Sequence, residues 1–432
     1  MSRGRHSETT VLIIGGGFAG VACAKTLAKQ DVNVTLVDRH NYSQFQPMLY
    51  QLATGQIATM GVARPLRGIL HKSRSVDVKM AEVTEVDPRA KVATCADGTT
   101  FSADYLVFAM GSAPNFFGTP GAEAESFPLY ALADAQRLRS RVLAVLEDAD
   151  RNPKLIDQGA LNFVIVGAGA TGVETAGALA DAVNDIVPAA FPELPHGAAR
   201  IYIADPGSVV LGPFSEKAHV YARQVLEKKG VQLILGARVT EVRPDRVVLS
   251  DGREILTRTV VWAGGIQGAK LAGNSGVAQG RGGRIDVAPD LTVDGFANVY
   301  ALGDVANTPG PDGKPFPQLG SVALQAGRWA AKNIVAEVEG RPRTPFMYRD
   351  KGIMAMIGKN AAVAEMGGKR RGLHGPIAFA SWLGVHAALL SGFRERSEAI
   401  RSWLWDYFTK TRPSSIIDRP DAAEIDWDGG AS

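Results

Sequence analysis

Two sets of glycines share one spacing, and that spacing could cradle the diphosphate of a dinucleotide. Gly15-x-Gly17-x-x-Gly20 directly follows an apolar run and precedes a predicted helix. In such a turn the first glycine permits the tight bend, the second lets the backbone approach the diphosphate, and the third lets helix pack on strand. The unpaired amides and the positive dipole end of the helix N-terminus then face the anion.

The same spacing recurs at Gly167-x-Gly169-x-x-Gly172, so the chain contains two similar dinucleotide-binding folds. In each repeat an acidic residue, Asp38 or Asp205, ends the next strand. Its carboxylate can accept hydrogen bonds from ribose hydroxyls, and at the second site it would repel a 2′-phosphate. The second site is therefore predicted to bind NADH in preference to NADPH, unless Asp205 only caps a loop.

The pair Gly303-Asp304 indicates which cofactor each fold holds. It follows a short apolar strand near the end of the second repeat, and a helix is predicted from about Ser321. In flavoproteins with two dinucleotide folds, an aspartate at this point binds the flavin ribityl chain. The helix that follows directs its N-terminus at the flavin N1–C2=O edge, which becomes negative on reduction. We expect FAD in the first fold and NADH in the second.

The segments around these motifs predict an α/β fold with two Rossmann-like domains. Helices are predicted over Val21–Lys29 and Val173–Ala182, and short apolar strands at Val11–Ile14, Val34–Val37, Tyr105–Ala109, Phe163–Val166, Ile201–Ile203, Thr259–Trp262 and Val299–Leu302. Alternating residues at Lys79–Phe101 and Val231–Glu254 predict β-hairpins. The predicted domains are a discontinuous FAD-binding domain (9–120 and 286–343), an NADH-binding domain (121–285), a C-terminal membrane- and quinone-associated region (344–417) and an acidic flexible tail (418–432).

Composition argues against several classes of protein. The 432 residues are 46% apolar and 21% charged, and a formal net charge of +3 gives no reason to expect nucleic-acid binding. Cys23 and Cys95 are the two cysteines and form no CxxC pair, which excludes a disulfide scaffold and a paired-thiol redox centre. The polar N-terminus lacks a secretory signal, and no run reaches the ~18 apolar residues of a membrane span. We therefore expect a cytoplasmic protein. No residues have metal-ligand spacing, so we expect no bound metal.

Several segments resemble the type II NADH dehydrogenases, which are single-chain, non-pumping NADH:quinone oxidoreductases. The resemblance covers about residues 10–417. Its more specific segment is Phe45–Gly55, where disulfide reductases place their cysteine pair. The other matching segments are Val11–Gly20, Gly167–Glu174, Val261–Gly265 and Tyr300–Asp304.

The resemblance assigns roles to individual residues. Asp38 and Asp304 would hold FAD, the Phe45–Gly55 loop would line the flavin, and Glu174 would lie beside the nicotinamide near the hydride path. Alternatively, Glu174 only caps its helix. The other expected FAD contacts are Gly15, Gly17, Phe18, Ala19, Gly20, Arg39, Gln51, Gly111 and Gly303. The expected NADH contacts are Gly167, Gly169, Gly172, Asp205, Gly264 and Gly265.

The predicted quinone site departs from the family pattern. The family's quinone segment usually reads Ala-Gln-x-Ala-x-Gln, whereas Gly320–Gln325 keeps the second glutamine and has Ser321 in place of the first. A serine reaches less far and offers no amide for a quinone carbonyl. The resemblance implies that Gln46, Ser321 and Gln325 bind the quinone, menaquinone or ubiquinone, and that Glu174 and Gln325 are the catalytic residues.

The C-terminal region is aromatic and basic. Ile400, Trp403, Leu404, Tyr407 and Phe408 are spaced to share one helix face. The nearby basic residues are Lys369, Arg370, Arg371, Arg394, Arg396, Arg401, Lys410 and Arg412. Rings and cations suit a lipid interface, so this helix is predicted to dock the protein peripherally on the inner face of the cell membrane. A core helix or a homodimer contact is the alternative, and His386 is expected to be a packed structural residue.

These observations predict an FAD-dependent NADH:quinone oxidoreductase of the respiratory chain. One rival is a related NAD(P)H-dependent flavoenzyme that uses another acceptor, for example in secondary metabolism. Another is a redox-sensing binding protein that changes its partner affinity when its flavin is reduced. A sulfide:quinone oxidoreductase would need reactive cysteines near the flavin, and Cys23 and Cys95 are badly placed for that role.

Overall fold

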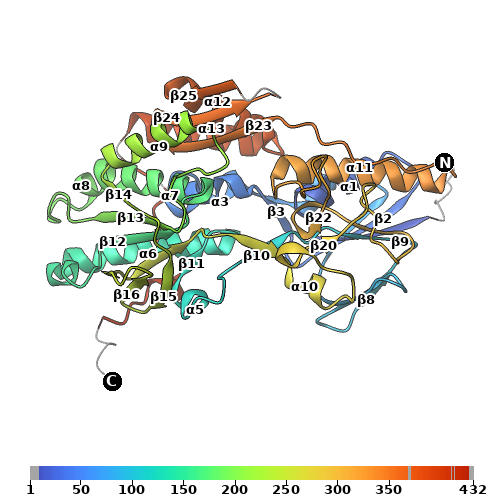
Figure 1. Cartoon of the computed structure of the whole chain (residues 1–432), viewed down its shortest axis with the longest axis horizontal. Coiled ribbons are helices and arrows are strands. Elements are labelled where there is room, and N and C mark those ends of the chain that lie inside the picture. Colours follow the sequence, from blue (N-terminus) through green and yellow to red (C-terminus); the bar gives the residue numbers. More distant parts are fainter. Residues whose placement is uncertain (1–8, 368–370, 410, 413, 428–432) are drawn as a thin grey trace. The chain divides into compact units, whose positions relative to one another are not determined.

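The chain forms two compact units in the computed structural model, which describes residues 9–367, 371–409, 411–412 and 414–427 (Figure 1). The first unit contains the chain up to Gln44, Arg64–Ala113 and Ile266–Asp350, and the second contains Phe45–Ala63, Pro114–Gly265 and the chain from Lys351. Among the described residues, no helix is long and apolar enough to cross a membrane. Each unit contains one of the two glycine turns.

A five-stranded parallel sheet forms the centre of the first unit. Its order is β21-β9-β1-β2-β5, made by Val299–Ala301, Tyr105–Phe108, Thr10–Ile14, Asn33–Asp38 and Val76–Met80. Strands covered on both faces read as continuous apolar runs, as Val11–Ile14 does. Helices α1 (Phe18–Leu27) and α11 (Gly320–Val338) pack closely because Gly327 lacks a side chain: a Cβ there would lie 2.2 Å from the Ala19 carbonyl oxygen.

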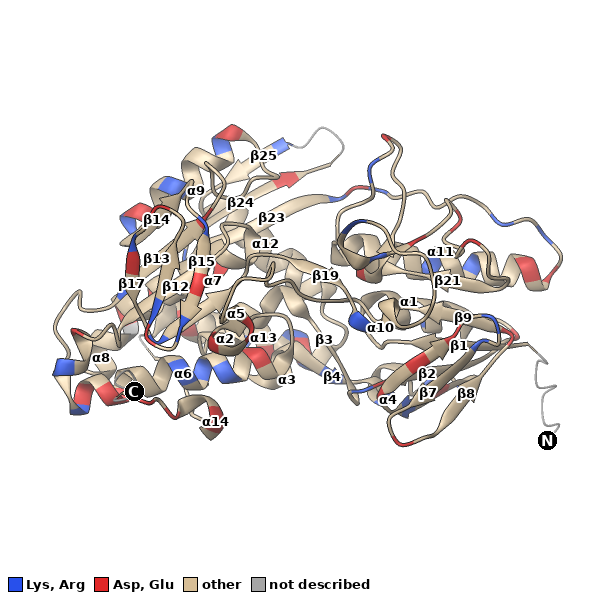
Figure 2. Ribbon diagram, turned by 60° about the horizontal axis from the view of Figure 1, so that its bottom comes forward, with Lys and Arg blue, Asp and Glu red and all other residues tan. Residues whose placement is uncertain are grey.

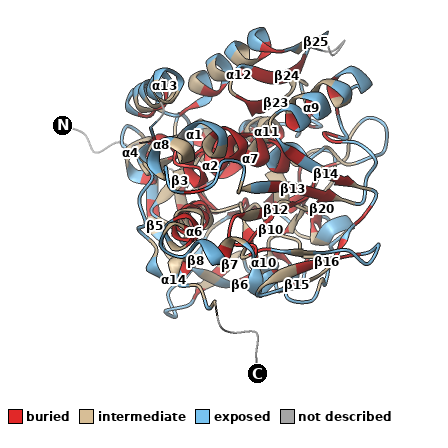
Figure 3. Cartoon of the chain, turned by 90° about the vertical axis from the view of Figure 1, so that its left-hand side faces the viewer, coloured by how far each residue is buried: buried red, intermediate tan, exposed pale blue. Residues whose placement is uncertain are grey.

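The second unit repeats this arrangement around another parallel sheet. Its order is β11-β18-β12-β13-β14, made by Phe127–Pro128, Thr259–Trp262, Asn162–Val166, Arg200–Asp205 and Val231–Leu235. Its longer helices are α6 (Leu132–Arg151), α7 (Ala170–Asp181) and α9 (Glu216–Lys228). Figure 3 shows α7 almost wholly buried, which explains its small, apolar sequence.

The two predicted hairpins are each a parallel strand followed by a small antiparallel sheet. β5 and β14 join the parallel sheets, and three-stranded antiparallel sheets follow them. These small sheets are β6-β7-β8 (Val83–Asp87, Val92–Cys95, Thr100–Ser102) and β15-β16-β17 (Val239–Arg243, Arg246–Leu249, Glu254–Leu256). The sequence pattern did not separate each parallel strand from the antiparallel strands that follow it, because polar and apolar residues alternate in both.

The C-terminal region adds an antiparallel sheet and two helices to the second unit. The sheet is β23-β24-β25 (Gly352–Gly358, Ala361–Met366, Arg371–His374), and the helices are α12 (Pro376–Leu389) and α13 (Phe393–Phe408). α12 covers β24, and α7 packs against β23. The Phe45–Ala63 segment also belongs here, contrary to the predicted domain boundaries, because α2 (Leu49–Ala53) packs on α6 and α7 and α3 (Thr59–Val62) on α13.

The chain beyond Asp418 packs on α6, where we had predicted a flexible tail. Arg139 and Asp418 form an ion pair, and α14 (Pro420–Ala423) buries Ala422 against α6. Trp427 donates from Nε1 to Asp148 at 2.8 Å. The prediction weighed the acidic residues of this segment and missed the alanine and tryptophan that hold it, while residues 428–432 lie outside the described chain.

The other elements are short. They are β3 (Tyr42–Gln44), η1 (Gln46–Met48), β4 (Ala63–Pro65), α4 (Leu66–Leu70), β10 (Ser112–Pro114), α5 (Ala122–Glu125), η2 (Pro153–Ile156), the π-helix η3 (Ala182–Ile186), α8 (Val187–Ala190), β19 (Ile266–Gly268), α10 (Lys270–Gly273), η4 (Arg281–Gly283), β20 (Ile285–Asp286), η5 (Gly303–Val305) and β22 (Ala306–Asn307).

Candidate functional site

The first glycine turn has the geometry that a diphosphate needs. Gly15 has φ +109°, and a Cβ on it would lie 2.4 Å from the Ala109 carbonyl oxygen. A Cβ on Gly20 would lie 1.9 Å from the Gly15 oxygen, whereas one on Gly17 would meet nothing within 4 Å. The outer two glycines are therefore required by packing, and the middle one leaves open space beside the turn, as the spacing predicted.

Asp38 holds this turn from the end of β2. Its carboxylate accepts from the backbone N–H of Gly16 at 2.6 Å and of His40 at 2.7 Å. No side chain caps the first turn of α1 and none of its residues is acidic, so its positive end is not neutralised within the helix. The open turn and the uncapped helix fit the diphosphate of a dinucleotide.

Asp304 lies in the same unit, on the turn η5 between β21 and α11. Its carboxylate accepts a long hydrogen bond, 3.4 Å, from the Ser112 hydroxyl. Burial raises the pKa of the Asp304 carboxyl, while this hydrogen bond and the Arg284 guanidinium lower it. α11 begins just beyond, with no side-chain cap and no acid in its first turn. A ribityl hydroxyl and an electron-rich flavin edge are the partners that this arrangement suits.

The second glycine turn repeats the first in the other unit. Gly167 has φ +106°, and a Cβ on Gly172 would lie 1.9 Å from the Gly167 oxygen. Asp205 accepts from the N–H groups of Ala168 at 2.7 Å and Gly207 at 2.6 Å. It therefore fixes the loop as well as standing where a ribose is expected. Gly169 again faces open space.

Glu174 does not cap its helix. Its Oε1 accepts from the Met356 N–H at 3.2 Å, so it points at strand β23. Burial raises the pKa of Glu174 to about 8, although the hydrogen bond from Met356 and the Trp382 indole act in the opposite direction. At neutral pH the carboxyl is therefore mostly protonated, which is the state from which a proton can be donated.

A cluster of aromatic and polar side chains surrounds this carboxyl. Tyr50 is fully buried, and burial followed by the charge of Glu174 raises the pKa of its phenol well above the usual value. Trp382 is also fully buried, and its indole faces Glu174, although no hydrogen bond of normal geometry joins its Nε1 to any of the described residues. His386 stacks on Trp382 at 3.7 Å between ring centroids, and burial lowers the pKa of its imidazole to about 4. His386 is a packed residue, as predicted.

Two glutamines predicted to touch ligands have other partners. Gln51 is buried, donating to the Tyr50 hydroxyl at 3.1 Å and accepting from the Trp403 indole at 2.8 Å. Gln325 donates to the Arg349 carbonyl and accepts from the Arg349 N–H, both at 3.0 Å. Each amide thus uses one N–H and one oxygen lone pair within the protein and keeps a second of each, so the predicted ligand contacts of both glutamines stay predictions.

The remaining predicted residues divide between the two units. Phe18, Ala19, Arg39, Gly111, Gly303, Ser321 and Gln325 belong to the first, and Gln46, Gln51, Gly264 and Gly265 to the second. Ala19 is buried under α11 and Arg39 is exposed. Gly111 and Gly265 have positive φ, so glycine is required there, whereas Gly264 faces the Trp262 ring at ordinary contact distance.

The aromatic face of α13 differs in part from the prediction. Ile400, Leu404, Tyr407 and Phe408 are exposed as expected, but Trp403 points inward to Gln51. Trp405 is exposed in its place, as are Ile377, Val385 and Leu389 of α12 and Phe393, the first residue of α13. Figure 2 shows α12 without a single charged position. The exposed set is apolar and wider than one helix face.

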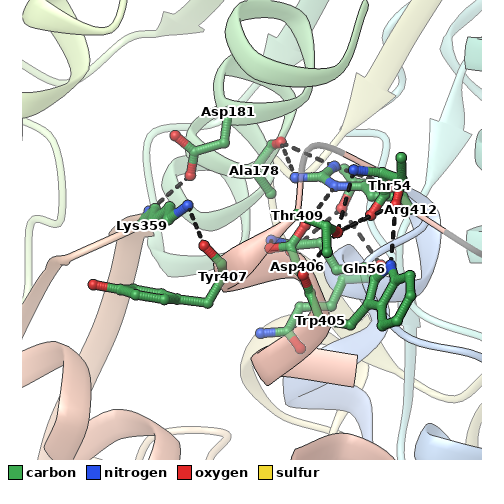
Figure 4. Close-up of polar contacts among 12 residues, drawn as sticks. Thr54, Gln56, Ala178, Asp181, Lys359, Trp405, Asp406, Tyr407, Thr409 and Arg412 are labelled. Atoms are coloured by element: carbon green, nitrogen blue, oxygen red, sulfur yellow. Dashed lines mark hydrogen bonds and ion pairs between the residues drawn. The ribbon is translucent and has the colours of Figure 1, made fainter. Parts of the chain in front are cut away.

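Arg412 is not a surface cation, contrary to our grouping of it with the basic residues near the helix. Its guanidinium is buried and donates to the Thr54 carbonyl at 2.7 Å, to Asp406 at 3.1 Å and to the Ala178 carbonyl at 3.4 Å (Figure 4). It ties the end of α13 to α2 and α7. Arg371, Arg394 and Arg401 are exposed, and Arg396 donates to the carbonyls that end α12. Lys369, Arg370 and Lys410 lie outside the described residues.

Sequence reasoning missed three residues. Trp382 faces Glu174, Tyr348 contacts Ser321, and Arg284 faces Asp304. Their partners lie 20 or more positions away in the sequence, so no local spacing indicates them. The aromatic residues of the C-terminal region were the one available signal, and they were read only as a surface feature.

The chain matches the family model of the pyridine nucleotide-disulphide oxidoreductases over residues 9–327. It is 35% identical over 422 residues to the type II NADH:quinone oxidoreductase Ndh of Mycobacterium tuberculosis, covering 94% of this chain and 90% of that protein. A type II NADH:quinone oxidoreductase of Staphylococcus saprophyticus is 29% identical over 83% of this chain and 90% of its own length. The solved NDH2 of Plasmodium falciparum in complex with NADH has a TM-score of 0.85 at 18% identity, covering 94% of this chain and 100% of that chain.

Proposed function

The chain belongs to the type II NADH:quinone oxidoreductases, within the pyridine nucleotide-disulphide oxidoreductase family, and we propose that its two glycine turns divide the cofactors between them. The enzyme oxidises NADH and reduces a quinone with FAD as the intermediate carrier, by the net reaction NADH + H⁺ + quinone → NAD⁺ + quinol. FAD is assigned to the first unit and NADH to the second. The assignment rests on Asp304 and the uncapped α11, which belong to the same unit as the first turn.

FAD, when bound, would supply the redox chemistry that carries two electrons from NADH to the quinone. The chain contributes binding and orientation. Asp38 fixes the turn that would cradle the diphosphate, and Asp304 would present its carboxylate to the ribityl chain. The positive end of α11 stabilises the charge that develops on the ring edge. In the second unit, Asp205 fixes the turn and accepts from the ribose hydroxyls of NADH.

We infer that Glu174 holds a proton near the nicotinamide. Its raised pKa, about 8, keeps the carboxyl neutral at physiological pH. A neutral carboxyl can donate a hydrogen bond and does not repel an electron-rich ring. Trp382 and Met356 lie beside it to support the ionised form once the proton has left. Gln325 bonds Arg349 through one N–H and its oxygen, and its second N–H could still donate to the quinone, as the resemblance implies.

The exposed apolar residues of α12 and α13 are proposed to dock on a membrane surface. Phe393 is 88% exposed and Phe408 is 77% exposed, which is unusual for phenylalanine on a surface that meets only water. Arg394 and Arg401 lie on the same helix and suit anionic lipid headgroups. Docking on the inner face of the cell membrane would bring the enzyme to a lipid-soluble quinone, and a homodimer contact through this surface is the alternative.

Quinone turnover by purified protein tests the function. We expect yellow protein that oxidises NADH slowly alone and rapidly with decylubiquinone or a menaquinone analogue, with quinol formed in equal amount to NAD⁺. If NADH reduces the flavin but no quinone reoxidises it, the result would instead indicate a related flavoenzyme that uses another acceptor. A colourless protein that cannot take up added FAD would exclude both.

A further inference from the structure

Arg284 is a buried cation in the first unit whose hydrogen bonds go to backbone carbonyls. It is 7% exposed, and its guanidinium donates from Nε to Arg281 at 3.3 Å and from Nη1 to Ala306 at 3.5 Å. Taking a guanidinium out of water is costly unless another charge compensates for the lost hydration. Two long hydrogen bonds to neutral carbonyls do not compensate for it, so a carboxylate nearby is needed to offset the burial of this charge.

The fold places Arg284 beside the turn that carries Asp304. Strand β20 begins at the residue after Arg284 and pairs in parallel with β22, the strand that directly follows the turn η5. Of the carboxylates near Arg284, that of Asp304 interacts most strongly with its charge, ahead of that of Asp286. Asp286 is exposed and accepts from Asn307 at 2.8 Å, so Asp304 is the buried counter-charge of this arginine.

Uncharged groups hold Asp304 in place on the remaining sides. Gln318 donates from Nε2 to the Asp304 carbonyl at 2.9 Å, and the Ser112 hydroxyl donates to the carboxylate at 3.4 Å. The elements that adjoin the turn are β10, β19, β21 and the first two turns of α11, and none of them contains an acidic or basic side chain. Within the part of the chain that the structure describes, Arg284 is therefore the charged group that acts on the Asp304 carboxyl.

The ionised state of Asp304 matters for its proposed partner, the ribityl chain. A carboxylate accepts hydrogen bonds from hydroxyls through both oxygens, and these charge-assisted bonds are stronger than those of a neutral carboxyl. Burial raises the pKa of Asp304 and so brings its protonation closer to neutral pH, whereas the Arg284 charge opposes this change. Burial also lowers the pKa of Arg284, but a guanidinium stays charged at physiological pH.

We propose that Arg284 is a positioning residue for FAD: its buried guanidinium keeps the Asp304 carboxylate charged, so that the ribityl chain stays bound as the surroundings become acidic. The inference deepens the proposed function and rests on it, because it needs FAD in the first unit. As the pH falls, a proton from solvent adds to the Asp304 carboxylate and weakens its hydrogen bond with a ribityl hydroxyl. Arg284 moves this protonation to a lower pH, so its removal should make FAD binding sensitive to mild acid.

The test measures the release of FAD from loaded enzyme after dilution, by the rise in flavin fluorescence, at pH 8 and at pH 6. The wild type should release FAD at rates that differ less than threefold between the two pH values. Arg284→Gln should release it about tenfold faster at pH 6 than at pH 8, because its Asp304 is then largely protonated at pH 6. Arg284→Lys keeps the charge, so its two rates should again differ less than threefold.

Arg281→Gln is the matched control. It removes the same charge from an exposed side chain three positions away and leaves the Arg281 carbonyl that accepts from Arg284. Its two release rates should differ no more than those of the wild type. Asp304→Asn provides the second control, because an amide does not titrate in this range. In the Asp304→Asn background, adding Arg284→Gln should not change the ratio of the rates at pH 6 and pH 8.

Equal release rates of Arg284→Gln at the two pH values would overturn the proposal. So would acid-sensitive release that persists when Arg284→Gln is combined with Asp304→Asn, because Arg284 would then not act through Asp304. If Arg284→Gln does not fold, Arg284→Lys decides, since acid-sensitive release from a variant that keeps the charge also contradicts the proposal. A wild-type protein that contains no flavin and takes up none would instead remove the proposed function itself.

Discussion

The charge state of Glu174 should affect both the stability of the fold and the proposed chemistry. Its pKa is raised from 4.5 to about 8 in the folded protein, so folding favours the neutral acid. The stabilisation is fully present below pH 4.5 and is lost as the pH rises towards and through about 8. In the role proposed above for Glu174, the same titration would also limit catalysis, because a carboxylate cannot donate the proton that a neutral carboxyl can.

Glu174→Gln should remove this pH dependence. The glutamine amide stays neutral at every pH. The melting temperature of the variant should therefore fall less than that of the wild type as the pH rises from 5 to 9. Thermal unfolding of FAD-loaded protein across this range measures the difference. Glu85→Gln, at an exposed strand position, serves as the control and should follow the wild type. Parallel curves for Glu174→Gln and the wild type would show that the carboxyl is not perturbed.

The residues of each motif could be predicted from the sequence. The side chains that form hydrogen bonds within the protein could not. Glycine spacing and the acids Asp38, Asp205 and Asp304 follow from rules of backbone geometry that act locally. Gln51 meets Trp403, 352 positions away, and Gln325 meets Arg349 after the chain reverses beside α11. A glutamine with both amide atoms bonded looks the same in sequence as one that awaits a ligand.

At the scale of elements, the two glycine turns are independent tests of cofactor assignment. A side chain at Gly20 or Gly172 would collide with a carbonyl oxygen 1.9 Å from its Cβ. Gly20→Val should yield colourless protein. Gly172→Val should remain yellow and be reduced by dithionite but not by NADH. Absorbance at the flavin maximum measures the flavin content of each variant, and anaerobic titration with NADH measures its reduction. If Gly172→Val were colourless and Gly20→Val yellow, the assignment of the two cofactors would be reversed.

The end of α13 is the second element-scale test. Arg412 is buried among the Thr54 and Ala178 carbonyls and Asp406, so Arg412→Ala leaves a carboxylate and two carbonyls without their donor. Breaking a buried ion pair in this way costs about 3 kcal/mol, and we expect a melting temperature several degrees lower. Arg401→Ala removes an exposed arginine, 77% accessible, from its pair with Glu398 and should change the melting temperature little. Equal effects of the two variants would contradict the buried role of Arg412.

Buried strands were the most predictable elements. Continuous apolar runs such as Val11–Ile14 and Phe163–Val166 are parallel strands, because only strands covered on both faces lack polar alternation. The hairpins were predicted less well, since β5 and β14 alternate in the same way as the antiparallel strands that follow them. The close packing of two helices could not be predicted from the sequence where it depends on one glycine, as at Gly327 against Ala19.

At the scale of the whole molecule, the exposed face of α12 and α13 should decide where the enzyme works. The triple variant Phe393→Ser, Leu404→Ser, Phe408→Ser should reduce binding to vesicles of mixed anionic and neutral phospholipid at least tenfold, because it removes three exposed apolar side chains. Its rate of flavin reduction by NADH should stay the same. Vesicle co-sedimentation measures binding, and Met80→Ser with Met347→Ser, both exposed on the first unit, provides the control.

Unchanged vesicle binding by the triple variant would contradict docking through this face. If analytical ultracentrifugation then shows that a wild-type dimer has become a monomer, the face is a contact between copies of the chain. The organisation into two units could be predicted from the repeated glycine spacing. The place of Phe45–Ala63 in the second unit could not, because its contacts come from α6, α7 and α13.

The uncapped first turns of α1, α7 and α11 have a consequence for the supply of the enzyme in a growing cell. No side-chain cap and no first-turn acid neutralises these helix ends, so a bound dinucleotide anion would add to the stability of the folded chain. A ligand that binds only the native state stabilises it by mass action. Newly made chains that find no FAD are therefore more exposed to proteolysis, and the cellular amount of this protein should follow riboflavin nutrition even when its transcription is constant.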